Sequence, residues 1–237
     1  MPLSLGALPR TQNVVGYWLL DEASGTRVDK TPNGNDLTDN NTVTQGTGHE
    51  GGSDKCAYFT RANNEYLSRA AASCVGLDGM SNLTISFWFN AVTVDYSRTF
   101  VTKGTTENPN SYTVFFYGFT PNTRIKFEIN GNNVVSVYNT FLPSQNTWYH
   151  VACVFKSADS LKIYINGELD NSQATTETAI VTTSSLPFII GNMANLGNAY
   201  GNGSIDEVAI WNCALNATEV KQIYTETCGG AAMLLML

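Results

Sequence analysis

Apolar and polar side chains alternate along much of this chain, which is the pattern of strands with one buried face. The clearest case is residues 83–89, whose apolar members fall on one face: Leu83, Ile85, Phe87 and Phe89. Similar runs, rich in β-branched and aromatic residues, occupy residues 14–20, 56–60, 65–68, 99–103, 112–119, 124–129, 133–138, 186–191 and 203–211. Turn-forming residues separate these runs, so the pattern predicts an all-β protein.

A β-hairpin is predicted near the middle of an antiparallel sheet. Aromatic and β-branched residues dominate 148–155, and polar turn-formers follow at 156–160. Apolar residues then alternate with polar ones over 161–165, and the Asn-Gly dipeptide at 166–167 supplies a tight turn. Two antiparallel strands followed by a second turn are therefore expected here.

Residues 216–224 are the one stretch that predicts an α-helix. Asn216 suits the N-cap and Glu219 the third helical position, which together form a capping box. Val220 and Ile223 then share one face of the helix. Because strands and helices do not alternate along the chain, the sequence favours two packed antiparallel sheets.

Several short motifs occur in a characteristic order: residues 16–22, 29–34, 83–89, 148–152, 163–167 and 190–211, followed by Ala214, Leu215 and Glu219. This order resembles that of laminin G-like domains, which belong to the concanavalin A-like jelly rolls. The resemblance implies a two-sheet antiparallel jelly-roll sandwich over residues 14–225, with one short C-terminal helix. It also implies a recognition module that binds glycans or cell-surface ligands. No linker interrupts this range, so one domain is expected.

Composition narrows the possible functions. Hydrophobic residues make up 43% of the 237 residues, enough for a sizeable core, and 14% are charged. The net charge is −7 and no basic run exists to neutralise phosphates, so nucleic acid is not an expected partner. No apolar stretch approaches the roughly 18 residues of a membrane span, and the first residues do not read as a signal peptide.

The five cysteines do not have the spacing of metal ligands. They stand at positions 56, 74, 153, 213 and 228 without a CxxC or Cys/His pattern, so zinc is not expected from them. Cys153 falls in the predicted core, where a free cysteine behaves as a small hydrophobe. Cys213 and Cys228 flank the predicted helix and either form a disulfide or stay reduced.

Oxygen-bearing side chains predict a structural calcium site. Asp29, Asn33 and Asn35 lie in a polar loop after the first predicted strand, and Asp206 lies in the last one. The resemblance implies that such acidic groups meet near a sheet edge, and calcium takes about six to eight oxygen ligands. The alternative is that Asp29 makes only an Asx turn and that Asp206 caps a strand end.

The acidic residues do not form a glycosidase pattern. Enzymes of the superfamily that the chain resembles carry Glu-x-Asp-x-(x)-Glu, which brings their carboxylates together. Glu168 and Asp170 lack a third acidic partner. Asp206 and Glu207 are adjacent, so they are expected on opposite faces of a strand.

The two histidines offer no catalytic arrangement either. His49 lies in a glycine-rich loop, where the sequence reveals no partner for it. His150 lies in a predicted strand and is expected to be a hydrogen-bonded structural residue. Since neither a Ser-His-Asp nor a Cys-His arrangement can be argued, the chain is expected not to be an enzyme.

Aromatic and amide residues in two loops are candidates for ligand binding. The first loop carries Tyr96, and the second carries Asn192, Asn195, Asn198, Tyr200 and Asn202. Flat rings stack on the C–H faces of sugars, and amides bond to sugar hydroxyl groups. The alternative is that these asparagines serve only the backbone of the loop.

The two ends of the chain favour a role in an assembly. The arm 1–13, with Leu3, Leu5 and Leu8, is expected outside the main fold, and the tail 226–237 ends in an apolar run. Exposed apolar segments promote association, so both ends are expected to dock into neighbouring subunits, unless the tail folds onto its own sandwich. Two functions stay open: a glycan or cell-surface binding module, and a structural or decoration protein of a virion or another extracellular homo-oligomer or assembly.

Overall fold

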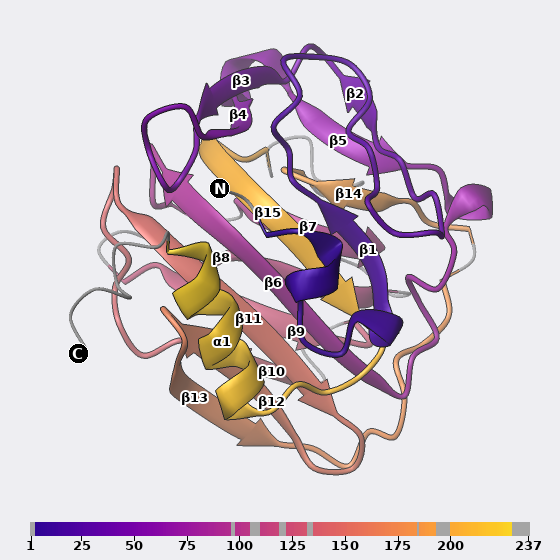
Figure 1. The fold of residues 1–237 in the computed structure, drawn as a ribbon. Coiled ribbons are helices and arrows are strands. Elements are labelled where there is room, and N and C mark those ends of the chain that lie inside the picture. The colour runs from indigo at the N-terminus through magenta and orange to yellow at the C-terminus, as the bar shows by residue number, and fades with distance from the viewer. Residues whose placement is uncertain are drawn as a thin grey trace, which may run out of the picture.

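The alternating apolar residues form two antiparallel sheets that pack face to face, as the computed structural model shows (Figure 1). It describes residues 3–95, 98–104, 110–118, 122–131, 135–183, 185–192 and 200–228. The predicted fold class, an all-β two-sheet sandwich with a short C-terminal helix, is confirmed.

The first sheet is built around the long strands from the centre and the end of the sequence. Its order is β13 (Glu168–Ala174), β12 (Ser160–Ile165), β11 (Trp148–Lys156), β6 (Asn82–Ala91), β15 (Gly203–Trp211), β4 (Lys55–Phe59) and β3 (Thr44–Thr47). A further strand, β1 (Val14–Trp18), also pairs with β15. The predicted hairpin is β11 with β12, and β6 pairs with the other side of β11.

The second sheet faces the first across the core. Its order is β10 (Val135–Tyr138), β9 (Arg124–Ile129), β8 (Asn110–Tyr117), β7 (Thr99–Gly104), β14 (Phe188–Ile190), β5 (Tyr66–Arg69) and β2 (Thr38–Asn40). Three strands, β2, β3 and β13, lie outside the predicted runs. Each is an edge strand made mostly of polar residues, so it carries no hydrophobic alternation that could predict it.

Side chains from the facing sides of both sheets fill the core. The apolar face predicted for β6 is buried there: Leu83, Ile85, Phe87 and Phe89. Cys153 of β11 is buried among them, as predicted. Full burial of such side chains contributes about 1.5–3 kcal/mol each, which makes this layer the main source of stability.

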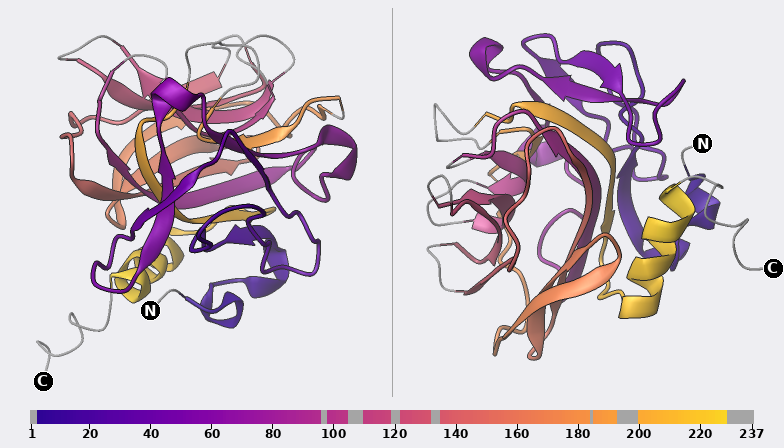
Figure 2. Two further views of the ribbon diagram at one scale, coloured as in Figure 1. Left: turned by 90° about the horizontal axis from the view of Figure 1, so that it is seen from above. Right: turned by 90° about the vertical axis from the view of Figure 1, so that its left-hand side faces the viewer.

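Helical segments cover the outer face of the first sheet. The helix α1 (Ala217–Thr227) and the 3-10 helices η1 (Leu5–Ala7) and η2 (Thr11–Asn13) lie across it, as both views in Figure 2 show. The predicted capping box of α1 is present, with Asn216 and Glu219 bonded reciprocally. A second apolar cluster fills this layer: Leu8, Val14, Tyr17, Ala152, Val154, Tyr164, Ala209, Trp211, Leu215, Val220 and Ile223.

The N-terminal arm therefore lies on the main fold, where the sequence placed it outside. Leu8 is only 4% exposed, and Leu3 and Leu5 pack against the same apolar cluster. The indole Nε1 of Trp211 donates to the Pro9 carbonyl at 2.9 Å. These leucines cover an apolar face of their own chain, which would otherwise be open to water.

The cysteines and the C-terminal tail were the subject of two further predictions. All five cysteines are free thiols, so Cys213 and Cys228 do not form a disulfide. Most of the apolar tail, residues 229–237, lies outside the described residues, and its docking stays a prediction. In the part of the chain that the structure describes, no helix combines the length and the apolar character needed to cross a membrane.

Candidate functional site

The site begins with an irregularity in β15. Residues 203–205 pair with β4 and residues 208–211 with β1, so Asp206 and Glu207 lie between the ends of two neighbouring strands. The register with β6 shifts between Asp206 and Ala209, and Glu207 takes a left-handed φ of 45°. An extra residue in a strand, with a shifted register, is a β-bulge, and bulges re-aim side chains.

The bulge places both carboxylates on the outer face of the sheet. Ile205 and Val208 are buried in the core between the sheets, so the two residues that separate them share the outer side. The backbone N–H of Leu3 donates to the Glu207 carboxylate at 3.3 Å, and that of His49 donates to the Asp206 carboxylate at 3.2 Å. The prediction that these residues point to opposite faces was wrong, because it assumed an unbroken strand.

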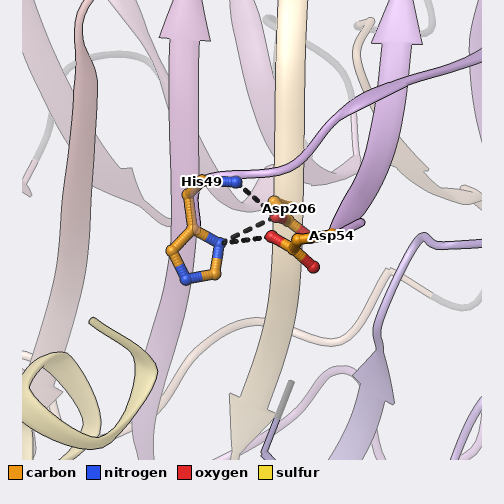
Figure 3. Close-up of side chains that lie close together, drawn as sticks. All are labelled: His49, Asp54 and Asp206. Atoms are coloured by element: carbon orange, nitrogen blue, oxygen red, sulfur yellow. Dashed lines mark hydrogen bonds and ion pairs between the residues drawn. The ribbon is translucent and has the colours of Figure 1, made fainter. Parts of the chain in front are cut away.

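A histidine and two aspartates meet beside the bulge (Figure 3). His49 and Asp54 come from the turn between β3 and β4, and Asp206 comes from β15. The His49 Nδ1 lies 2.8 Å from Asp206 Oδ2 and 3.7 Å from Asp54 Oδ2, with side chains 2%, 2% and 9% exposed in that order. A Cβ atom at Gly48 would overlap the Asp54 carboxylate, so this close turn requires glycine.

The imidazole of His49 is held from several sides. It stacks on the Trp88 indole, with ring centres 4.3 Å apart and an interplanar angle of 13°. Its Nε2 lies 2.7 Å from the Thr227 carbonyl oxygen at the end of α1. The Trp88 indole in turn donates to the Thr227 hydroxyl at 3.0 Å and stacks on Tyr224. The end of α1 is thus fixed to the sheet through this ring.

The pKa values of His49, Asp206 and Glu207 are all raised. Burial opposes the charged form of His49, but the hydrogen bond and charge of Asp206 outweigh it and raise the pKa of His49. Burial raises the pKa of Asp206 and raises that of Glu207 to about 8. Carboxylate and carbonyl oxygens only accept hydrogen bonds, so the imidazole donates from both nitrogens and carries a positive charge.

The second histidine is neutral. His150 is 1% exposed, and its Nε2 lies 2.8 Å from the Ser86 hydroxyl oxygen. Burial, followed by the charge of His49, lowers the pKa of His150 to about 3. The prediction of a hydrogen-bonded structural residue is confirmed.

Acid is expected to destabilise the chain through His150. Its folded pKa of about 3 lies below its ordinary value near 6.5, so the unfolded chain binds the extra proton between these values. This share of the stability is complete above about pH 6.5 and decreases as the pH falls. Urea unfolding at about pH 7 and about pH 5 should show the parent losing about 2 kcal/mol more than His150→Gln. Equal losses in both proteins would contradict this assignment.

An open cleft lies near the start of β15, away from this group. It has a volume of about 440 Å³ and is lined by Thr60, Arg61, Ala62, Asn64, Tyr200 and Asn202. The ring of Tyr200 lies 6.4 Å from that of Tyr66. A smaller pocket nearby, lined in part by Asn202 and Gly203, has about 20 Å³ and holds no more than a water molecule.

The floor of the cleft is held in place by a buried carboxylate. The 3-10 helix η3 (Arg61–Asn63) forms this floor, and Glu65, 1% exposed, follows it. The Glu65 carboxylate accepts from the Thr60 N–H at 2.6 Å and from the Asn63 amide at 2.8 Å. The Arg61 guanidinium lies 3.6 Å from the Asp95 carboxylate. The η3 side of the cleft is therefore held in place by the protein's own hydrogen bonds.

The predicted ligand contacts divide into three groups. Tyr200 and Asn202 line the cleft together. Asn192 is 6% exposed and buried away from it. The others lie outside the described residues: Tyr96, Asn195 and Asn198.

The residues predicted as calcium ligands in the first loop form a separate hydrogen-bond network. Asp29 Oδ1 accepts from the N–H groups of Tyr17 and Thr31, at 3.0 and 2.9 Å. Asp29 Oδ2 accepts from the Thr31 hydroxyl and the Asn35 N–H, both at 2.8 Å. The side-chain amides of Asn33 and Asn35 donate to one backbone carbonyl of β1. All four in-plane lone pairs of Asp29 are engaged by protein donors.

The fourth predicted ligand, Asp206, has other partners. Among the described residues, the group of possible metal ligands that contains Asp206 is completed by His49 and Asp54, without Asp29. Sequence reasoning missed both partners, because the hairpin β3–β4 must fold before they approach β15. The available signal was their position in one glycine-rich turn, residues 48–54.

A family model described as the concanavalin A-like lectin/glucanases superfamily, of the laminin G type, matches residues 62–221. The chain belongs to this superfamily. The match begins within η3 and ends in α1, and it includes β15 with its bulge and all the cleft residues except Thr60 and Arg61. The predicted family is therefore confirmed.

The chain is similar in sequence to a receptor and in fold to two solved binding domains. The human adhesion G-protein coupled receptor D1 is 32% identical over 96 residues, 40% of this chain and 11% of the receptor, so the chain matches only about a tenth of it. Domain 4 of AbnA, an extracellular arabinanase from Geobacillus stearothermophilus, solved with arabinotriose, has a TM-score of 0.66, 19% identity, and coverage of 90% of this chain and 98% of that one. The botulinum neurotoxin serotype G binding domain has a TM-score of 0.67, 19% identity, and coverage of 91% and 51%. The two solved structures thus share the fold of this chain.

Proposed function

We propose that this chain is a non-catalytic glycan-binding module whose ligand occupies the cleft beside Tyr200. The observation that carries the proposal is the cleft itself, in which an aromatic ring, two amides and a guanidinium surround about 440 Å³. That volume falls within the range of about 300–1,000 Å³ typical of small-ligand sites. The similarity to Domain 4 of AbnA, which was solved with arabinotriose, supports a sugar ligand.

The chemistry of the lining suits a sugar. The Tyr200 ring offers a flat apolar surface for sugar C–H groups, while the amides of Asn64 and Asn202 can donate to and accept from hydroxyl groups. Arg61 supplies further donors, and its side chain remains 42% exposed beside Asp95. Because Glu65 fixes η3, the backbone on that side of the cleft requires little ordering on binding.

The acidic residues support a binding role over a catalytic one. Asp206 and Glu207 are the adjacent pair that shares one face, and they are 1% and 6% exposed. Both side chains are buried, with Leu3 bonded to one and His49 to the other, so a glycan does not reach them in this conformation.

Replacing Tyr200 by alanine is expected to weaken glycan binding at least about tenfold, or about 1.4 kcal/mol. The physical reason is the loss of the one aromatic surface among the cleft residues named above. The parent is first tested on a glycan array that includes arabino-oligosaccharides and ganglioside sugars, and the best ligand is then titrated by calorimetry.

The matched control is Tyr117→Ala, which removes another partly exposed tyrosine from the second sheet. Tyr117 is 38% exposed and its ring centre lies 5.5 Å from that of Tyr138, so it offers an alternative aromatic surface. Loss of binding in Tyr117→Ala with retention in Tyr200→Ala would move the site to the second sheet. Absence of any array ligand at millimolar concentration would overturn the glycan-binding function and favour a role in an assembly.

A further inference from the structure

The group formed by His49, Asp54 and Asp206 takes no part in the proposed sugar cleft, since none of the three lines it. It combines an imidazole nitrogen with two carboxylates from segments that are distant in sequence. Burial of such a set in one place requires compensation for the cost of removing the charges from water. A bound cation would supply this compensation, so the group is a candidate for a second site.

The spacing of the three ligand atoms fits one tetrahedral ion. Zinc binds imidazole nitrogen and carboxylate oxygen at about 2.0–2.2 Å, which puts two tetrahedral ligands about 3.4 Å apart. The Nδ1 of His49 lies 2.8 Å from one carboxylate and 3.7 Å from the other, values on either side of that spacing. All three atoms lie within 4.8 Å of one another. To reach this spacing, Nδ1 and the Asp206 oxygen would separate by about 0.6 Å, and Nδ1 and the Asp54 oxygen would approach by about 0.3 Å.

The second ring nitrogen of His49 has the kind of hydrogen-bond partner that is usual for a metal-binding histidine. A histidine that binds a metal through one nitrogen usually donates its other N–H to a carbonyl or carboxylate. Here the Nε2 of His49 lies 2.7 Å from the Thr227 carbonyl, at the negative end of α1. This contact leaves Nδ1 directed toward Asp54 and Asp206, as Figure 3 shows.

A third buried carboxyl group, that of Glu207, lies beside the three proposed ligands. Glu207 is 6% exposed, and its Oε2 has no hydrogen-bond partner among the described residues. The charges of His49, Asp206 and Asp54 act on its carboxyl group, which places Glu207 close to the three proposed ligands. The bulge also holds Glu207 at a left-handed φ of 45°, and such strain concentrates at functional positions.

From this geometry we infer that His49 Nδ1, Asp54 and Asp206 bind a zinc ion, with a water molecule in the fourth position. The ion replaces the proton that Nδ1 shares with Asp206, and this proton passes to the buffer. Calcium is a poorer occupant, because it requires about six to eight oxygen ligands and does not favour imidazole. The ion joins the turn 48–54, β15 and the end of α1 into one structural unit.

The test uses the whole chain, stripped of metal with a chelator, and adds zinc or cobalt(II) chloride alone. The parent should bind one zinc ion per chain by calorimetry and show the visible absorption of tetrahedral cobalt(II). At zinc concentrations about 100-fold above the Kd, the melting temperature should rise by about 5 °C or more. His49→Gln should abolish all three signals, and Asp54→Asn should weaken zinc binding at least about tenfold.

The chain supplies its own matched control in His150→Gln, which removes the other histidine and should leave zinc binding unchanged. If His49→Gln does not fold, the cobalt(II) absorption of the parent and the zinc affinity of Asp54→Asn test the site instead. Three results would overturn the site: no cobalt absorption and no thermal shift in the parent, equal binding in His49→Gln, or a sulfur-to-cobalt charge-transfer band that places the ion on cysteine. Each can be read without any sugar ligand.

Discussion

Replacing Asp29 by alanine is expected to destabilise the chain by at least about 3 kcal/mol, and to the same extent in calcium and in EDTA. The side chain is 6% exposed and accepts from three backbone N–H groups, those of Tyr17, Thr31 and Asn35. A buried donor left without an acceptor costs about 1–3 kcal/mol, so three such donors account for the expected loss. Urea unfolding followed by tryptophan fluorescence, in both buffers, measures it.

A matched control comes from the same loop. The Asp36 carboxylate accepts from the Asp29 N–H at 2.9 Å, so Asp36→Ala should cost about 1 kcal/mol. If Asp29→Ala instead lost stability only when calcium was present, Asp29 would be a calcium ligand, as the sequence suggested. The structure favours the first result, because protein donors already engage every in-plane lone pair of this carboxylate.

Asp29 also shows why part of a site can be predicted from sequence. Its partners Thr31 and Asn35 lie within six residues, so an Asx-type turn was a local alternative that the sequence could suggest. What the sequence could not decide was whether the oxygens face a cation or N–H groups. That choice depends on the Tyr17 N–H of β1, which is in place only after the strand has formed.

Most of the fold was predictable for a similar reason. Period-two alternation is a local property, and it identified β6, β11, β12 and β15 before any pairing was known. Polar edge strands carry no such alternation, and β13 was therefore missed. The bulge in β15 was also missed, because it follows from the change of partner strand between β4 and β1.

In the candidate sites, too, the residues that local sequence identifies were predicted, and those brought in by folding were missed. Tyr200 and Asn202 were predicted from loop composition, and both line the cleft. Their partners from η3, such as Arg61, were not, because that segment meets them only in the folded chain. His49 seemed isolated for the same reason, since Asp206 lies 157 residues away along the chain.

Gly203→Ala is expected to destabilise the chain by at least about 3 kcal/mol, while Gly201→Ala costs less than about 1 kcal/mol. Gly203 has a φ of +134°, which an L side chain rarely adopts. A Cβ there would overlap the Asn90 carbonyl oxygen and lie 3.0 Å from backbone atoms of Ala91 and Val92. Backbone of β6 cannot retreat without breaking the pairing of Gly203 with Ala91.

Gly201 is the matched control, two residues earlier in the same segment. Its added Cβ would come no closer than 3.4 Å to another atom, the Gly191 carbonyl oxygen, which is tolerable contact. Unfolding of both variants in urea gives the comparison directly. Equal stability of the two would show that β6 can move away from β15 at this point. Because Asn202 lies between the two glycines and lines the cleft, such mobility would also remove the pre-formed geometry on which the proposed sugar site depends.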